Sequence, residues 1–342
     1  MLEPLFGKTL DELKELMRNL NLPTYTASQI ADWLYKKDIH SIEEMSNLSK
    51  KTRNILSEKF QIGLTSPSQV QTSRDGTKKY LFPVSGGNYI ESAFIPELNR
   101  NTLCVSSQAG CMRHCVFCMT GRQGLHGNLT AGEIVNQVKS LPERETLTNL
   151  VYMGMGEPFD NFHEVMNSLE IITSPWGFDW SPKRITVSTI GIVPAVRKYL
   201  NISSCNLAIS LHSPFENERK KLMPIEKAQP FQKIINEIKS HDINRHRKIS
   251  IEYILFKGVN DTPRHVNELA KVLNGIRCRV NLIHYHPIPG TSLMGTSLHN
   301  MEKFRNDLNN KGIVATIRKS RGQDIAAACG MLSTNKSSAA EK

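Results

Sequence analysis

Three cysteines stand close together in the sequence, at Cys111, Cys115 and Cys118. Three thiolates with this CxxxCxxC spacing can bind three irons of a [4Fe–4S] cluster and leave the fourth iron open for another ligand. The alternative is a structural zinc site, which normally uses four ligands, and His114 inside the triad is the local candidate for the fourth. The spacing favours the iron–sulfur cluster.

The remaining cysteines differ in their sequence settings. Cys205 and Cys278 begin apolar, strand-like runs and are expected to be small buried residues, as free cysteines commonly are. Cys104 comes seven residues before the triad. Cys329 lies in a segment rich in small residues, which can approach a ligand closely, although a packed C-terminal thiol is the simpler interpretation.

The cellular compartment decides how these seven cysteines are interpreted. No apolar stretch approaches the roughly 18 residues of a membrane span, and the first residues lack a basic segment followed by an apolar one. We therefore expect a cytoplasmic protein. A reducing compartment disfavours structural disulfides and favours thiols that bind metal or take part in catalysis.

Beyond the cysteines, strand-like runs alternate with helical segments, which indicates parallel β/α units. Six or seven such units predict a partial or full barrel, whose reactive residues lie at the C-terminal ends of the strands. The predicted strands are Leu150–Met153, Ile185–Ser188, Leu207–Leu211, Ile249–Leu255, Val280–Tyr285 and Ile313–Ile317. The predicted helices lie near 131–141, 161–173, 230–239, 262–274 and 299–310.

The first hundred residues have a different pattern. Residues 9–60 are typical of helices, beginning with Thr9 and Glu12 in capping-box spacing, and short strands follow with a hairpin turn at Asp75-Gly76. The α/β chain is therefore predicted to have four parts. These are a helical domain (1–62), a β extension (63–103), a core barrel (104–330) and a flexible tail (331–342).

Lys and Arg exceed Asp and Glu by 43 to 32, a net charge of +11. This excess points to a polyanionic partner such as nucleic acid rather than to a membrane surface, although charge alone also serves solubility. Part of it lies on a basic predicted helix around Lys50 and Lys51. The other candidate phosphate contacts are Arg53, Arg219, Lys220, Lys221, Arg245 and Arg247.

Polar residues and glycines gather at the ends of the predicted strands, where hydroxyl, imidazole and backbone groups could bind a cofactor. Each alone is more typical of a loop residue that satisfies its own backbone, so their shared placement is the evidence. The residues are Gly156 and Glu157 in MGMGEP, Ser188, the trio Ser210, Leu211 and His212, and His286.

The triad resembles the signature of the radical S-adenosylmethionine superfamily. The resemblance implies one [4Fe–4S] cluster, whose open iron is chelated by the amino and carboxylate groups of the cofactor's methionine. It also implies that the strand-end residues bind S-adenosylmethionine. The family has Asn where this chain has His286, and an imidazole can also donate or accept a hydrogen bond.

The run Arg318–Gly330 and Cys104 closely resemble the RlmN enzymes, and the resemblance extends over almost the entire chain. It implies methylation of C2 of a specific adenine in 23S rRNA, and of an adenine in tRNA. The related Cfr enzymes, which attack C8, are the alternative. Arg318–Gly322 favours C2, whereas Ser188–Gly191 and Lys221–Pro224 resemble Cfr. A non-enzymatic RNA-binding protein with structural zinc is a second alternative.

The RlmN resemblance also implies a mechanism. Cys329 takes a methyl group from one S-adenosylmethionine, and a second is split to the 5′-deoxyadenosyl radical that activates this methyl, so two are used per turnover. Cys104 then resolves the RNA adduct through a transient disulfide with Cys329. Glu91 matches the family's proposed proton acceptor, and Cys104 is the alternative base. Without the resemblance, Glu91 would be interpreted as a surface charge on the β extension. An electron donor such as flavodoxin supplies the electrons.

Overall fold

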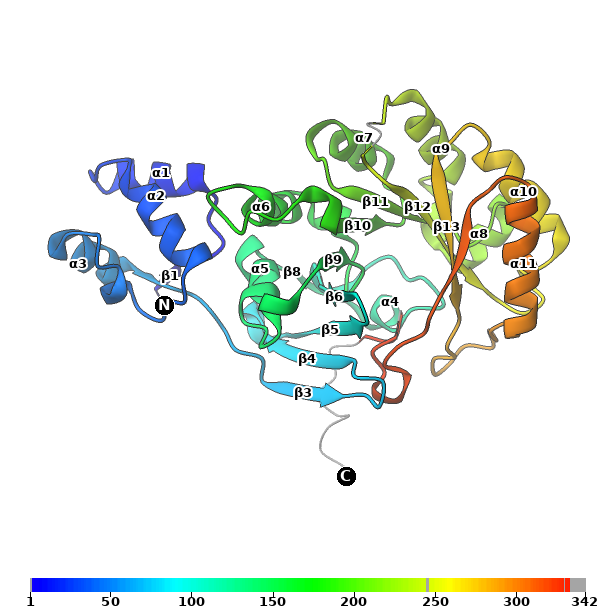
Figure 1. Cartoon of the computed structure of the whole chain (residues 1–342), viewed down its shortest axis with the longest axis horizontal. Coiled ribbons are helices and arrows are strands. Elements are labelled where there is room, and N and C mark those ends of the chain that lie inside the picture. The colour runs from blue at the N-terminus through cyan, green and yellow to red at the C-terminus, as the bar shows by residue number, and fades with distance from the viewer. Residues whose placement is uncertain (1, 244–245, 329, 333–342) are drawn as a thin grey trace.

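The computed structural model describes residues 2–243, 246–328 and 330–332. Its centre is a ten-stranded sheet that is open within the described residues, with β14 and β3 at its two ends (Figure 1). Seven neighbouring strands are parallel and form a partial barrel, so the predicted α/β fold is confirmed. They are β6 (Arg100–Cys104), β9 (Asn149–Tyr152), β10 (Ile185–Thr189), β11 (Asn206–Ser210), β12 (Ile249–Leu255), β13 (Cys278–His284) and β14 (Ala315–Arg318).

Helices follow most of these strands and cover the outer face of the sheet. Tyr253 in β12 stacks on Phe304 of α11, and the hydroxyl of Tyr152 in β9 is 2.9 Å from that of Ser168 in α6. The helices are α5 (Ala131–Lys139), α6 (Phe162–Thr173), α7 (Val193–Ile202), α8 (Glu216–Leu222), α9 (Phe231–Ser240), α10 (Pro263–Leu273) and α11 (Leu298–Asn310). Helices α7 and α8 were not predicted from the sequence.

Three antiparallel strands, β5 (Tyr89–Glu97), β4 (Lys78–Pro83) and β3 (Gln69–Thr72), extend the same sheet beyond β6. The predicted hairpin turn at Asp75-Gly76 joins β3 to β4, and Gly76 has a φ of +84°, which glycine adopts without strain. The β extension is therefore hydrogen-bonded directly to the barrel sheet.

The strand register decides which side chains share the inner face of the sheet. Side chains alternate between the two faces along a strand, and register partners on neighbouring strands lie on the same face. The face of one residue therefore gives the face of its partner on the next strand. The inner face holds Glu91, Cys104, Ser188, Ser210, Glu252, Asn281 and Arg318, which come from six strands of the barrel and one of the β extension.

The first sixty residues form helices α1 (Leu10–Asn19), α2 (Thr26–Ala31) and α3 (Lys50–Lys59), and β1 (Glu3–Pro4) pairs with β2 (Phe60–Gln61). The predicted capping box of Thr9 and Glu12 is confirmed at α1. This region packs on α5, where Gly7 and Gly132 are so close that a Cβ on Gly7 would lie 2.3 Å from the Cα of Gly132. No helix among the described residues is long and apolar enough to cross a bilayer.

After β14 the chain crosses from one end of the open sheet to the other (Figure 1, orange to red). We call residues 319–328 the strap. The Asp75 carboxylate accepts a hydrogen bond from the Gly322 amide at 2.9 Å. The Asp324 carboxylate accepts from the Ser73 hydroxyl at 2.5 Å and from the Arg74 amide at 3.1 Å. The strap is thus fixed to the β3–β4 turn.

Candidate active site

Cys111 is the last residue of β7 (Gln108–Cys111), and Cys115 and Cys118 lie between β7 and α4 (Met119–Gln123). We call residues 111–118 the cysteine loop. The strand β8 (Gly124–Asn128) pairs back onto β7. Cys111 and Cys115 are buried and Cys118 is half-buried. A Cβ on Gly110, whose φ is +78°, would lie 1.9 Å from the Gly124 carbonyl oxygen. Only glycine allows β7 and β8 to approach so closely at the loop.

The loop fits three iron-binding thiolates. Burial raises the pKa of Cys111 to about 12 and the pKa of Cys115 well above its usual value, so iron would have to displace their protons. In the part of the chain that the structure describes, no three His, Cys, Asp or Glu side chains converge as ligands of one metal ion. A cluster does not require such convergence, because each thiolate binds its own iron. The Nδ1 atom of His114 is 3.1 Å from the Gly121 carbonyl oxygen.

The ends of β10 and β11 are held by a buried arginine. Arg219 is fully buried, pairs with Glu226, and donates hydrogen bonds to the carbonyls of Ile190, Ser210 and Leu211. The interpretation of Arg219 as a phosphate contact is therefore wrong, since the side chain lies under the strand ends. Arg245 is outside the described residues.

Glu157 uses its side chain inside the protein. Its carboxylate accepts hydrogen bonds from the Thr189 hydroxyl at 2.6 Å and from the amides of Ile190 and Phe159 at 2.9 and 3.1 Å. Burial raises the pKa of Glu157 to about 7. These contacts join the loop after β9 to the end of β10. Gly156, with a φ of +96°, packs against Gln108.

The other strand-end residues divide into two groups. Ser188 and Ser210 are half-buried on the inner face, where their hydroxyls can meet a bound molecule. His212 is buried, and its Nδ1 accepts a hydrogen bond from the Ile254 amide at 3.0 Å. Burial lowers the pKa of His212 to about 3, so the ring is neutral, and it packs edge-on against Phe117 of the cysteine loop. Leu211 is buried.

His286 lies on the loop after β13 and contacts the strap. Its Nε2 is 2.8 Å from the Ser320 hydroxyl, and its ring is 5.2 Å from that of His284. Burial lowers the pKa of His286, with a contribution from the neighbouring His284. The imidazole thus links the strap to the barrel mouth.

Glu91 and Cys104 lie on the inner face at the junction of the β extension and the barrel. The Glu91 carboxylate pairs with the Lys79 ammonium at 2.9 Å, and both side chains are buried. The Glu91 carbonyl accepts a hydrogen bond from the Ser106 hydroxyl at 2.6 Å. Cys104 is buried in an apolar cluster that includes Ala93 and Ala327 of the strap.

Cys329 is outside the described residues, but the chain on both sides of it is placed. Ala327 belongs to the cluster of Cys104. The Gly330 carbonyl accepts a hydrogen bond from the Met119 amide at 2.8 Å, and a Cβ on Gly330 would lie 3.2 Å from the Phe117 carbonyl oxygen. A described residue before this position therefore contacts the cluster of Cys104, and the one after it contacts the cysteine loop.

Known proteins resemble the chain over nearly its whole length. The family model for the radical SAM superfamily matches residues 105–271, and the model for the ribosomal RNA large subunit methyltransferase N-terminal domain matches residues 4–62. The probable dual-specificity RNA methyltransferase RlmN of Parabacteroides distasonis is 53% identical, with 97% of each chain covered. The chain belongs to the RlmN family. The RlmN of Dichelobacter nodosus is 42% identical over 90% of this chain and 88% of its own.

A radical SAM methyltransferase from Sphaerobacter thermophilus has a known crystal structure that matches 97% of this chain and 100% of its own, with a TM-score of 0.90 and 37% identity. The predicted membership of the RlmN family, and with it an enzyme of the S-adenosylmethionine-dependent methyltransferase class, is confirmed. The family implies a [4Fe–4S] cluster and S-adenosylmethionine. Membership also removes the non-enzymatic zinc protein as an alternative.

Two buried polar residues of this RlmN-family chain, Lys79 and Glu252, were not predicted from the sequence. Lys79 was hidden in a β-extension strand, and only the pairing of β4 with β5 brings it to Glu91. Glu252 is a charged residue inside the apolar run of β12. This could have identified it from the sequence, because a charged residue in a buried strand requires partners.

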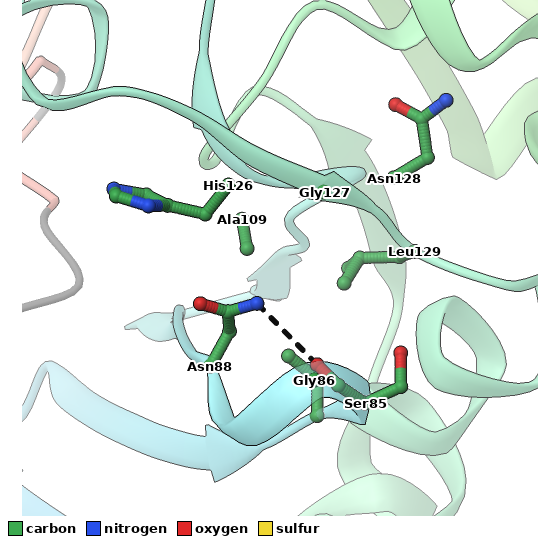
Figure 2. Close-up of a pocket in the computed structure, with 9 residues that line it drawn as sticks. Ser85, Gly86, Asn88, Ala109, His126, Gly127, Asn128 and Leu129 are labelled. Carbon is green, nitrogen blue, oxygen red and sulfur yellow. Dashed lines mark hydrogen bonds between the residues drawn. The ribbon is translucent and has the colours of Figure 1, made fainter.

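A separate pocket of about 160 Å³ lies between the β4–β5 connection and the β7–β8 pair (Figure 2). Asn88 and His126 are among its lining residues, and the Asn88 side chain donates a hydrogen bond to the Ser85 carbonyl at 3.4 Å. None of its lining residues is a cysteine or a carboxylate residue. We therefore do not assign this pocket to the reaction of the RlmN-family site.

Proposed function

We propose that the chain methylates C2 of a specific adenine in 23S rRNA, and of an adenine in tRNA, in the cytoplasm. The observation that carries the proposal is the placement of the chain on both sides of Cys329. The described neighbours of Cys329 in the chain, Ala327 and Gly330, contact the cluster of Cys104 and the cysteine loop, and this supports Cys329 as the methyl carrier. We also propose that the chain has four parts, at 1–62, 63–103, 104–330 and 331–342. The first part would position the RNA.

Each residue has one task in the proposed reaction. Cys111, Cys115 and Cys118 would hold the single cluster, and the cluster with S-adenosylmethionine supplies a hydrogen-abstracting radical when bound. Gly156, Glu157, Ser188, Ser210, Leu211, His212 and His286 would form the S-adenosylmethionine site. Through their contacts Glu157, Leu211 and His212 shape the strand ends, whereas Ser188 and Ser210 offer hydroxyls on the inner face.

The thiols of Cys329 and Cys104 and the carboxylate of Glu91 would carry out the carbon–sulfur chemistry. The Cys329 thiolate would take a methyl group from one S-adenosylmethionine, and a second S-adenosylmethionine would supply the radical that removes a hydrogen from that methyl. The methylene carbon bonds to C2 of adenine, whose electron-poor ring would not attack a methyl sulfonium. Glu91 would accept the C2 proton, and the single electron released with it would return to the redox centre that supplied the first one. Cys104 then attacks the Cys329 sulfur, which forms a disulfide and releases the carbon to gain a proton and become the methyl group.

The disulfide must be reduced before the next turnover, and the first electron must also be supplied. A donor such as flavodoxin would serve the cluster, and a thiol reductant would serve the disulfide. C8 methylation of the Cfr type remains the second candidate. It rests on the Cfr-like segments at Ser188–Gly191 and Lys221–Pro224.

Mass spectrometry of digested RNA after an anaerobic reaction tests the proposal, because it separates 2-methyladenosine from 8-methyladenosine. We expect 2-methyladenosine from the wild-type protein. We expect neither product from Cys111→Ala, Cys115→Ala or Cys118→Ala, each of which should also lose iron. A full iron content in any of these three variants, or 8-methyladenosine as the product, would contradict the assignment.

A further inference from the structure

Four polar side chains lie side by side across the inner face of the barrel. Ser210 in β11 is the register partner of Glu252 in β12, Glu252 is the partner of Asn281 in β13, and Asn281 is the partner of Thr316 in β14. We call these four residues the polar row. Since register partners lie at the same level of a sheet, the row crosses four adjacent strands at one depth. Ser210 stands at the end of its strand, so the row lies just inside the mouth of the barrel.

Glu252 is the charged member of the polar row, and its two carboxylate oxygens have different surroundings. Oε1 accepts hydrogen bonds from the Asn281 side-chain amide at 2.8 Å and from the Ser250 hydroxyl at 3.0 Å. The Arg318 guanidinium is 3.5 Å from the same oxygen. Oε2 is buried and has no hydrogen-bond partner among the described residues. The Glu252 side chain is only 4% exposed.

A buried carboxylate oxygen without a donor is costly, and buried polar atoms in folded proteins nearly always have a partner. Arg318 and Asn281 hold the charge and fix the orientation of the carboxylate through Oε1, so Oε2 remains as an acceptor on the inner face. A hydrogen-bond donor on a molecule bound inside the barrel would supply the missing partner. Carboxylates that recognise nucleosides commonly accept a hydrogen bond from a ribose hydroxyl.

We infer that Glu252 Oε2 accepts a hydrogen bond from the ribose 2′-hydroxyl of an adenosine bound inside the barrel. The inference rests on the proposed function, which brings two adenosines to this mouth. One is the adenosyl group of S-adenosylmethionine, and the other is the target adenosine of RNA. Both carry the same 2′-hydroxyl, and the experiment separates them.

The test compares the reconstituted holoenzyme with Glu252→Gln, which keeps the shape and the Oε1 acceptor but replaces the Oε2 acceptor with an amide donor. Glu302→Gln, on the exposed surface of α11, is the matched control. The dissociation constant of S-adenosylmethionine is measured by equilibrium dialysis, and that of an RNA fragment containing the target adenosine by filter binding. Loss of a hydrogen bond to a charged group should weaken binding at least about tenfold in one of the two measurements.

Both measurements are then repeated with a ligand that lacks the 2′-hydroxyl, either 2′-deoxyadenosyl-methionine or RNA with a single 2′-deoxyadenosine at the target. If Glu252 contacts that hydroxyl, Glu252→Gln should cost nothing further with the deoxy ligand, as in a double-mutant cycle. Such coupling in the first arm assigns Glu252 to S-adenosylmethionine, and coupling in the second assigns it to RNA.

Absence of coupling in both arms would overturn the inference, and so would a lower urea midpoint of unfolding with both dissociation constants unchanged. Failure of the proposed function has a different signature, since it would appear as RNA digests without methyladenosine. The S-adenosylmethionine arm measures binding alone and does not depend on that result.

Discussion

The buried pair of Lys79 and Glu91 leads to a prediction that separates stability from chemistry. Their side chains are 7% and 5% exposed, and the ammonium nitrogen lies 2.9 Å from the carboxylate oxygen. Glu91→Gln removes the charge that compensates the buried Lys79 ammonium. Breaking a buried pair from one side costs about 3–5 kcal/mol. We therefore expect the free energy of unfolding of Glu91→Gln to fall by about that amount in urea titrations followed by circular dichroism.

The neighbouring Lys78 supplies a matched control, because its pair with Glu143 is more exposed. Lys78→Met should cost less than about 1 kcal/mol, as expected for a pair close to solvent. The double variant Lys79→Met with Glu91→Gln contains no buried charge at this site. It should recover to within about 1 kcal/mol of wild type, since neutral replacements of a buried pair are often well tolerated.

Activity of the double variant then tests whether Glu91 accepts the proton. If it does, the stable double variant should methylate Cys329 normally and still form little methylated RNA. Wild-type RNA methylation by the double variant would assign Glu91 to the ion pair alone. A Glu91→Gln protein with an unchanged free energy of unfolding would refute the stability argument itself.

Three further predictions address other parts of the chain. Cys104→Ala should accumulate protein joined to RNA through Cys329, visible as a nuclease-sensitive shift on a denaturing gel. Cys329→Ala should give neither the adduct nor the methylated product. Repeated turnover by Cys104→Ala without the adduct would mean that Cys104 is only a packing residue. Because the folded pKa of His212 is about 3 and that of an unfolded histidine is about 6.5, His212 contributes stability above pH 6.5 that is lost as the pH falls towards 3. From pH 7.5 to 5 the wild type should lose about 2 kcal/mol more unfolding free energy than His212→Asn, and equal losses would contradict this. The exposed Lys50 and Lys51 of α3 should contact RNA phosphates. The double variant Lys50→Glu with Lys51→Glu should therefore weaken RNA binding at least about tenfold and leave S-adenosylmethionine cleavage unchanged. An RNA affinity equal to that of the wild type would contradict this role.

Sequence periodicity was enough to predict the barrel, because its strands are short apolar runs separated by amphipathic helices. The strands β10 and β12 begin where they were predicted. Helix α8 was missed because most of its seven residues are charged and only Arg219 and Leu222 are buried. Buried Arg219 also shows why charge in a sequence is a poor guide to surface, since its carbonyl partners come from strand ends that only the fold brings together.

The site residues were predicted more unevenly. Spacing identified Cys111, Cys115 and Cys118, since their chemistry needs only a short loop. The partnership of Lys79 with Glu91 and the polar row around Glu252 depend on strand register, which cannot be read from single residues. The contacts of the Glu157 side chain could not be predicted either, because its partners are Thr189 at the end of the next strand and Ile190 just after it.

The contacts of the strap can form only late in the synthesis of the chain on the ribosome. Asp75 and its partner Gly322 are 247 residues apart in the chain. At roughly 5–20 residues per second, synthesis of the intervening chain takes roughly 10–50 s. For most of that time the nascent protein contains the cysteine loop but lacks Cys329. We therefore expect a polypeptide released early by premature termination to bind iron without methylating RNA, so that completion of translation itself acts as the last step of active-site assembly.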